Sequence, residues 1–178
     1  MQIALLRGTN VGKAKRVAMA ELCAIVAELG FGDVKTLLNS GNVIYSSPGT
    51  PPDEAGARIQ EALLARTGVS SRVIVLTGEE LVEAIDGNPL GEPTENPSRF
   101  LVAVLRAPED RARLEPLLDE DWGTDGFALG RRVAYLWCRD GVLESRLPDA
   151  LARAAGDAAT TRNWATMLKL RALVDPPK

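Results

Sequence analysis

The residues best suited to chemistry stand near the start of the sequence, where cations and glycines follow a short apolar run. Four cations, Arg7, Lys13, Lys15 and Arg16, precede the first acidic residue of the chain, Glu21. Arginine and lysine supply charge and N–H donors for phosphate or carboxylate groups. A loop between a strand and a helix also leaves backbone N–H groups pointing outward. The segment therefore predicts an anion site, and the alternative is a solvated loop that needs its glycines to turn.

A Walker A loop does not account for this segment. That motif has four residues between its first glycine and Gly-Lys, and a serine or threonine follows. Here three residues separate Gly8 from Gly12-Lys13, and Ala14 comes next. The residues that we expect to contact an anion here are Arg7, Gly8, Asn10, Gly12 and Lys13.

A second polar group, Asn39-Ser40-Gly41-Asn42, stands between two apolar strand patterns. Asparagine and glycine readily take left-handed conformations, so this stretch is typical of a hairpin turn. If the turn lies beside the cationic loop, Ser40 and Asn42 would add a hydroxyl and an amide to the anion site. A turn alone also explains the same residues.

A third group is Thr160-Thr161-Arg162-Asn163-Trp164. Thr160 or Thr161 suits the N-cap of a helix from residue 161 to 174, which would put Arg162, Thr166 and Lys169 on one polar face. An arginine in the first helical turn opposes the helix dipole and indicates a partner for that side chain. We predict that Arg162, Asn163 and Lys169 join the anion site, with a structural buttress as the alternative.

Composition excludes several kinds of chemistry. The sequence of 178 residues has no histidine, which excludes an imidazole base, a Ser-His-Asp or Cys-His site and any histidine-bound metal. The formal net charge is -3 and the pI about 5.1, so strong nonspecific binding to nucleic acid is not expected. Three tryptophans and three phenylalanines give only weak support for a nucleic-acid partner. The sequence points to no cofactor and no metal.

The sequence carries neither a signal-peptide core nor an apolar stretch of about 18 residues, so we expect no membrane segment and a cytoplasmic protein. Its two cysteines, Cys23 and Cys138, fall in apolar patterns far apart and are expected to be reduced core residues.

The predicted elements of the first half alternate in a recognisable order. Strands at 2–7, 34–38, 43–46 and 72–76 are interleaved with helices at 19–29 and from Pro52 onward. The order strand, helix, strand, strand, helix, strand is that of a ferredoxin-like module, an antiparallel sheet with both helices on one face. Leu64 is expected on the buried face of the second helix.

The second half repeats this pattern in part. It has strands at 100–105, 127–129 and 133–138, a helix near 109–118, and helices at 147–155 and 161–174 in place of a helix and a strand. The predicted fold class is α+β, with two ferredoxin-like modules in tandem and a helical C-terminus. The predicted organisation is a module at 1–85, a linker rich in proline and glycine at 86–98, and a second, incomplete module at 99–178.

Several of these stretches together resemble the DUF1697 family. They are Arg-Gly-Thr-Asn-Val-Gly at 7–12, Met-Ala-Glu-Leu at 19–22, Ser-Gly-Asn-Val at 40–43 and Thr-Arg-Asn-Trp at 161–164 with Lys169-Leu170. The resemblance implies a bacterial protein of tandem ferredoxin-like modules and implies no reaction. The chain departs from the family pattern at Lys13-Ala14, at Ala165 and at Glu144.

Three functions stay open at this point. The first is binding of a phosphate- or carboxylate-bearing ligand, such as a nucleotide or an RNA end, in a cationic cleft between the modules. The second is an interaction module whose polar motifs hold the two halves together. The third is an enzyme that acts on a phosphorylated or acyl substrate without histidine, with Tyr45, Lys169 or a carboxylate as the proton carrier.

Overall fold

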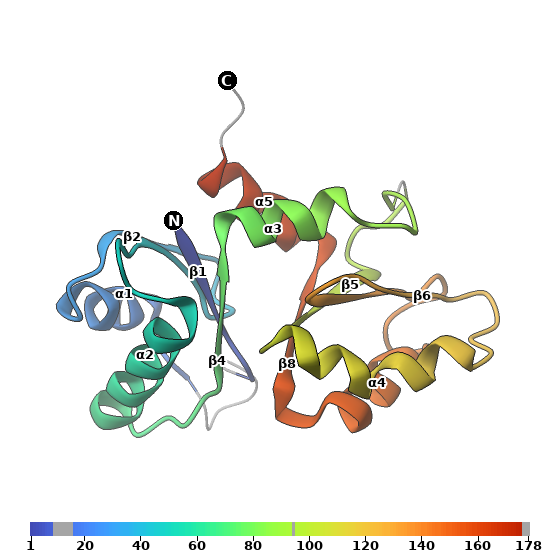
Figure 1. Ribbon diagram of the computed structural model, residues 1–178, viewed down its shortest axis with the longest axis horizontal. Coiled ribbons are helices and arrows are strands. Elements are labelled where there is room, and N and C mark those ends of the chain that lie inside the picture. Colours follow the sequence, from blue (N-terminus) through green and yellow to red (C-terminus); the bar gives the residue numbers. More distant parts are fainter. Residues whose placement is uncertain (9–15, 94, 176–178) are drawn as a thin grey trace. The chain divides into compact units, whose positions relative to one another are not determined.

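The computed structural model describes residues 1–8, 16–93 and 95–175 of the chain (Figure 1). In chain order its elements are β1 Gln2–Leu6, α1 Met19–Glu28, β2 Gly32–Leu37, β3 Asn42–Ser46, α2 Pro52–Thr67, β4 Val73–Thr77, α3 Gly78–Asp86, β5 Phe100–Leu105, the 3-10 helices η1 Pro108–Arg113 and η2 Glu115–Asp119, β6 Gly126–Leu129, β7 Val133–Trp137, α4 Leu147–Ala155, the 3-10 helix η3 Gly156–Ala158, β8 Ala159–Asn163 and α5 Trp164–Val174.

The first four strands form an antiparallel sheet in the order β2-β3-β1-β4. Side chains alternate between the two faces of a strand, so Ala4 and Leu6 of β1 share one face. They pack there with Leu22 of α1 and Ile59 of α2, all of them buried. Both crossover helices therefore cover the same face of this sheet (Figure 1).

The last four strands repeat this order as β6-β7-β5-β8, again antiparallel. Ala103 of β5 and Leu136 of β7 pack with Leu114, beside η1, and with Leu151 of α4. The opposite face of the sheet meets α3 and α5, because Phe100 contacts the ring of Trp164 at 5.1 Å and the Tyr135 hydroxyl donates to the Ala84 carbonyl at 2.6 Å. The predicted α+β class of two tandem ferredoxin-like sheets is confirmed.

The chain divides into two compact units, residues 1–79 with 172–178 and residues 80–171. The first unit contains the first sheet with α1 and α2, and the second unit contains the second sheet with α4. The division falls within α3, whereas the sequence placed a linker at 86–98.

The predicted helix at 161–174 begins too early. Residues 159–163 form strand β8, which pairs with β5 and gives the second sheet its fourth strand. The helix starts at Trp164, and Asn163 rather than a threonine caps it, because the Asn163 Oδ1 accepts the Thr166 N–H at 2.9 Å. The β-branched Thr160 and Thr161 suit a strand better than a helical turn. Arg162 therefore does not share a helix face with Thr166 and Lys169.

Two smaller expectations are also wrong. The helix expected near 109–118 is a pair of 3-10 helices, since Pro116 has no N–H for an α-helical bond and its ring obstructs the preceding turn. Leu64 is half exposed on α2 instead of buried. Gly30 follows Leu29 after α1 with a φ of 87°, the left-handed conformation that commonly ends a helix.

None of the helices in the described ranges has the length and apolar character needed to cross a bilayer.

Candidate anion site at the end of the first sheet

One end of the first sheet collects the ends of three strands. The Leu6 N–H donates to the Gly41 carbonyl at 2.8 Å, and the Arg7 N–H donates to the Arg72 carbonyl at 2.9 Å. These bonds extend the β1–β3 and β1–β4 ladders by one step each. They bring Arg7, Gly8, the turn before Asn42 and Arg72 to the same sheet end.

Arg7 and Arg72 form an arginine pair across neighbouring strands. Leu6 lies opposite Val73 in the register, so the next position sets Arg7 opposite Arg72. Alternation puts both residues on the face that carries Leu5, away from α1 and α2. Like charges at directly opposed positions are destabilising. Arg72 is half-buried and has a partner of its own, so the exposed Arg7 is the arginine of this pair that an anion could reach.

The Arg7 side chain is exposed, and within residues 1–8, 16–93 and 95–175 it forms no ion pair with a carboxylate. The buried Ser71 hydroxyl fixes the backbone below it by donating to the Arg7 carbonyl at 2.9 Å. Gly8 follows with a φ of 67°, a left-handed conformation that favours glycine. Arg7 thus stands on a fixed backbone with its guanidinium directed to solvent.

The turn from Leu38 to Gly41 closes the other side of this sheet end. Asn42 is fully buried, and its Nδ2 donates to the Leu37 carbonyl at 2.9 Å and to the Ser40 Oγ at 2.8 Å. Asn42 therefore stabilises the turn through hydrogen bonds of its buried side chain, in agreement with the predicted hairpin turn. Ser40 is half-buried and lies near the surface of the same turn.

Of the predicted ligand contacts, the structure brings Arg7, Gly8, Ser40 and Asn42 together. Asn10, Gly12 and Lys13 lie outside the described residues. Arg162, Asn163 and Lys169 belong to the second unit, so their participation in one site with Arg7 stays a prediction.

The second sheet has a matching end with the same backbone bonds. The Leu105 N–H donates to the Arg132 carbonyl at 2.9 Å, and the Arg106 N–H donates to the Ala158 carbonyl at 2.8 Å. Arg106 therefore occupies in the second module the position that Arg7 occupies in the first.

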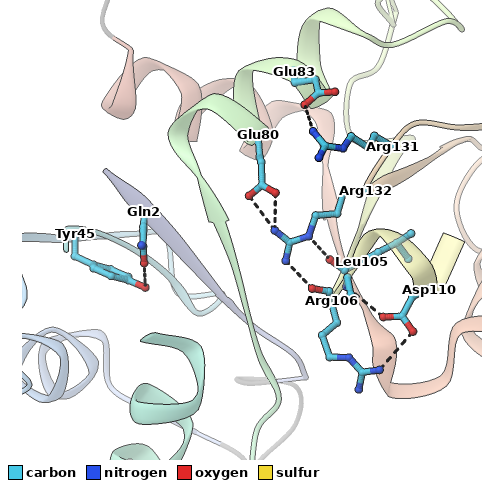
Figure 2. A network of polar contacts seen from close by, with 10 residues as sticks. Gln2, Tyr45, Glu80, Glu83, Leu105, Arg106, Asp110, Arg131 and Arg132 are labelled. Atoms are coloured by element: carbon cyan, nitrogen blue, oxygen red, sulfur yellow. Dashed lines mark hydrogen bonds and ion pairs between the residues drawn. The ribbon is translucent and has the colours of Figure 1, made fainter. Parts of the chain in front are cut away.

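At this second end the cations have acidic partners from the same unit (Figure 2). Arg106 pairs with Asp110 at 3.4 Å, and Asp110, only 7% exposed, also accepts the Ala107 N–H. Arg132 donates from one nitrogen to both oxygens of Glu80 at 2.9 Å. Arg131 lies 3.8 Å from Glu83.

Arg132 is the most fully bonded cation of this network. Its side chain is 10% exposed, and besides Glu80 it donates to the carbonyls of Leu105 at 3.1 Å and Arg106 at 2.7 Å. Charged and neutral acceptors together satisfy its planar fork of N–H groups. This arginine stabilises the fold and leaves little charge for a ligand.

Arg162 lies on β8 with 9% exposure. Its Nη1 donates to the Thr160 Oγ1 at 3.0 Å and to the Thr161 carbonyl at 2.9 Å. Desolvation by burial lowers the pKa of Arg162 to about 10. Asn163 caps α5, whereas Lys169 is exposed on that helix. These contacts support a structural role for Arg162 and Asn163.

Tyr45, the tyrosine considered as a proton carrier, does not lie on the sheet face that carries Arg7. Tyr45 is buried on the helix-covered face, its hydroxyl donates to the Gln2 Oε1 at 3.1 Å (Figure 2), and desolvation raises its pKa. Cys138 is buried and reduced, and desolvation raises its pKa as well. Within the described residues, no three cysteine or acidic side chains group closely enough to hold a metal ion.

Three residues that the sequence reasoning did not select matter most here: Arg72, Arg132 and Glu80. Arg72 could have been found, because in a ferredoxin-like sheet the start of the fourth strand lies beside the end of the first. The pairing of Arg132 with Glu80 joins residues far apart in sequence and leaves no local signal.

The fold defines a protein of two tandem ferredoxin-like modules. A model of the family described as DUF1697, protein of unknown function, matches residues 1–135, and the chain belongs to this family. The conserved bacterial protein SP0830 from Streptococcus pneumoniae has a similar solved structure, with a TM-score of 0.75, 18% sequence identity and 98% of each chain covered. At that identity the likeness shows the fold alone. A comparison with curated proteins finds no match.

Proposed function

We propose that this protein binds a small phosphate- or carboxylate-bearing ligand at the end of the first sheet, and that it does so in the cytoplasm. The observation that carries the proposal is the contrast between the two sheet ends. Arg106 and Arg132 have acidic partners in the second module, whereas Arg7, on an equivalent backbone, has none among the described residues.

Charge and backbone geometry support the same proposal. Arg7 presents an exposed side chain, and a guanidinium group binds phosphate or carboxylate through two parallel N–H bonds. The sequence adds Lys13, Lys15 and Arg16 shortly after Gly8. An anion bound at Arg7 would gain charge-assisted hydrogen bonds.

The site favours binding over turnover. A reaction without histidine requires another proton carrier within hydrogen-bond reach of the ligand. Tyr45 is buried beneath the helices with a raised pKa, which leaves it unsuited to that task. The enzyme hypothesis therefore has less support than the binding hypothesis.

The second candidate function, a structural or interaction module, draws support from Asn42 and Arg162. Asn42 holds its own turn, and Arg162 is buried against Thr160 and Thr161. If every polar motif served the fold in this way, no anion would stabilise the protein.

A thermal-shift titration with inorganic phosphate separates these functions. We expect phosphate to raise the melting temperature of the parent protein and of Arg106→Gln, which changes the equivalent residue of the second module. Arg7→Gln should lose most of this rise, with an affinity at least about tenfold weaker, because one charge-assisted contact contributes about 1.5 to 3 kcal/mol. Equal phosphate responses in Arg7→Gln and the parent would refute the proposal.

A further inference from the structure

Strand β6 forms one edge of the second sheet and has β7 as its neighbour. The Gly130 N–H donates to the Val133 carbonyl at 2.8 Å, and in an antiparallel ladder such bonds recur at every second residue. Ala128 therefore bonds to β7, whereas the backbone N–H and carbonyl groups of Phe127 and Leu129 point away from the sheet. In the described part of the chain, these outward groups have no hydrogen-bond partner.

Both faces of β6 are covered within the second unit. The side chains of Phe127 and Leu129 pack against the core that contains Leu136. On the opposite face, Leu90 lies so close to Gly126 that a Cβ at this glycine would come within 3.3 Å of the leucine Cδ1. The part of β6 that stays unpaired is therefore its backbone edge, and not an apolar face.

The other three sheet edges each carry a feature that hinders pairing with a further strand. Strand β2 has a register shift before Lys35. On β4, the Gln60 Oε1 accepts the Val73 N–H at 3.3 Å. On β8, Arg162 donates to the Thr161 carbonyl at 2.9 Å. Strand β6 has no register shift, no proline and no charged residue, so it is the edge best suited to accept another strand.

The edge of β6 is complementary to a second copy of itself. When two copies align antiparallel about a two-fold axis at Ala128, Phe127 of one copy lies opposite Leu129 of the other, and the two residues exchange their outward N–H and carbonyl groups. The same register sets Asp125 of one copy opposite Arg131 of the other, on both sides of the axis. Moving the axis by one residue in either direction would set one of these charges opposite an apolar residue. Charge therefore favours the register about Ala128.

Neither of these two charges is held in a strong ion pair within the chain. The Arg131 side chain is 71% exposed, and its contact with Glu83 at 3.8 Å is a surface pair that contributes little (Figure 2). The Asp125 Oδ1 accepts the Arg139 N–H at 2.9 Å, which fixes the carboxylate just before β6. Its Oδ2 has no hydrogen-bond partner among the residues that the structure describes.

We propose that two copies of this protein associate through β6, so that their second sheets join into one antiparallel sheet across a two-fold axis at Ala128. Addition of a strand at an open sheet edge is a common mode of recognition. The inference is independent of the proposed anion site, because Arg7 belongs to the first unit and β6 to the second. A pairing of two four-residue strands is smaller than the interface of a permanent dimer, so we expect a reversible equilibrium between monomer and dimer.

Sedimentation velocity of the full chain over a range of concentrations tests this association. We expect the parent protein to shift from monomer to dimer as its concentration rises. Arg131→Glu sets two acids opposite each other, and Asp125→Lys sets two cations opposite each other, so each variant alone should dimerise at least about tenfold more weakly. An equimolar mixture of the two variants restores opposite charges at both ends of the interface and should dimerise like the parent. Arg153→Glu, the same charge change at an exposed position of α4, should also behave like the parent.

Leu129→Pro tests the backbone bonds separately from the charges. Proline removes an outward N–H, while the bonds to β7 are made by Ala128 and Gly130, so the sheet should keep its circular dichroism and the dimer should weaken at least about tenfold.

Three results would overturn the inference. A parent protein that stays monomeric at every concentration would leave the β6 edge to a strand of a different protein. A dimer that Arg131→Glu and Leu129→Pro both leave intact would have to form through another surface. Failure of the mixed charge variants to dimerise would show that Asp125 and Arg131 do not face each other across the axis.

Discussion

The ends of the two sheets have the same backbone hydrogen bonds but differ in the acidic partners of their arginines. In each module the first strand ends in leucine and an arginine follows, whose N–H donates to the carbonyl of the residue before the fourth strand, Arg72 in one case and Ala158 in the other. The second module then surrounds its cations with Asp110 and Glu80, whereas the first places Arg72 beside Arg7. The two modules thus differ at equivalent positions: Arg106 pairs with an acidic side chain, whereas Arg7 has no carboxylate partner among the described residues.

This difference indicates which arginines stabilise the fold. Arg132 is nearly buried, and its charged and carbonyl acceptors surround it, so its removal would leave Glu80 and two backbone carbonyls poorly satisfied. The exposed Arg7 side chain makes no described contact of this kind. Stability should therefore depend on the second sheet end, and anion binding on the first.

The largest effect is expected from Arg132→Met. Breaking a largely buried, hydrogen-bonded ion pair by removing one partner costs about 3 to 5 kcal/mol. Chemical denaturation should show a loss in the free energy of unfolding within or just below that range, since Glu80 is partly exposed. Arg131→Met serves as the control, because its pair with Glu83 is exposed and should contribute less than about 1 kcal/mol. Equal losses in the two variants would contradict the assigned role of Arg132.

Asp110→Asn should come next. The Asp110 carboxylate accepts the Ala107 N–H and lies within 3.4 Å of both Arg106 and Arg113. Loss of the charge weakens these contacts and keeps the size of the side chain, so we expect a decrease of about 1 to 3 kcal/mol in the free energy of unfolding. Glu109→Gln, at an exposed neighbouring position, should change it by less than about 0.5 kcal/mol.

Tyr135→Phe tests the second sheet through its pH dependence. Desolvation, with a smaller effect of Glu83, raises the pKa of Tyr135 to about 12, while an unfolded tyrosine titrates near 10. The stabilisation is fully present below about pH 10 and is lost as the pH rises through 12, since the unfolded state releases its proton first. Between those pH values the free energy of unfolding should decrease less steeply with rising pH in Tyr135→Phe than in the parent protein.

The same Tyr135→Phe variant also loses the hydrogen bond to the Ala84 carbonyl. At neutral pH this should reduce the free energy of unfolding by about 1 to 2 kcal/mol. An unchanged alkaline slope in the variant would show that Tyr135 does not contribute to it.

Leu38→Gly should have the smallest effect and the opposite sign. Leu38 has a φ of 59°, a left-handed conformation that is unfavourable for leucine. Glycine relieves this strain, but its greater freedom in the unfolded state offsets part of the gain. The free energy of unfolding should therefore rise by at most about 1 kcal/mol. Leu64→Gly changes an equally exposed leucine inside α2 and should lower it by about 1 kcal/mol. If Leu38→Gly lowers stability as much as Leu64→Gly, Leu38 is not strained.

Most of the architecture follows from sequence pattern, and the exceptions have physical causes. Alternating apolar residues and turn chemistry predict every described strand of the two sheets except β8. Strand β8 was missed because it runs directly into α5, so Thr160 and Thr161 resemble a helix start. Pro116 marks the break in the helix expected near 109–118, a local signal that helical spacing concealed.

The candidate site was predictable only where its parts were local. Arg7 and Gly8 stand out by spacing, and Ser40 and Asn42 by turn chemistry. Arg72 can be predicted as a neighbour of Arg7 only when the fourth strand is placed beside the first. At the second sheet end, Arg132 pairs with Glu80, which is 52 residues away in sequence. Charge compensation between distant residues has no signature in a single sequence.

A phosphate titration followed by amide chemical shifts in ¹⁵N-labelled protein tests the contrast between the sheet ends most directly. We expect the largest, saturable shifts at the amides of Arg7, Gly8 and Gly41, with little change at Arg106 and Ala107. Shifts of equal size at both sheet ends, or none at Arg7 and Gly8 at saturating phosphate, would contradict the account.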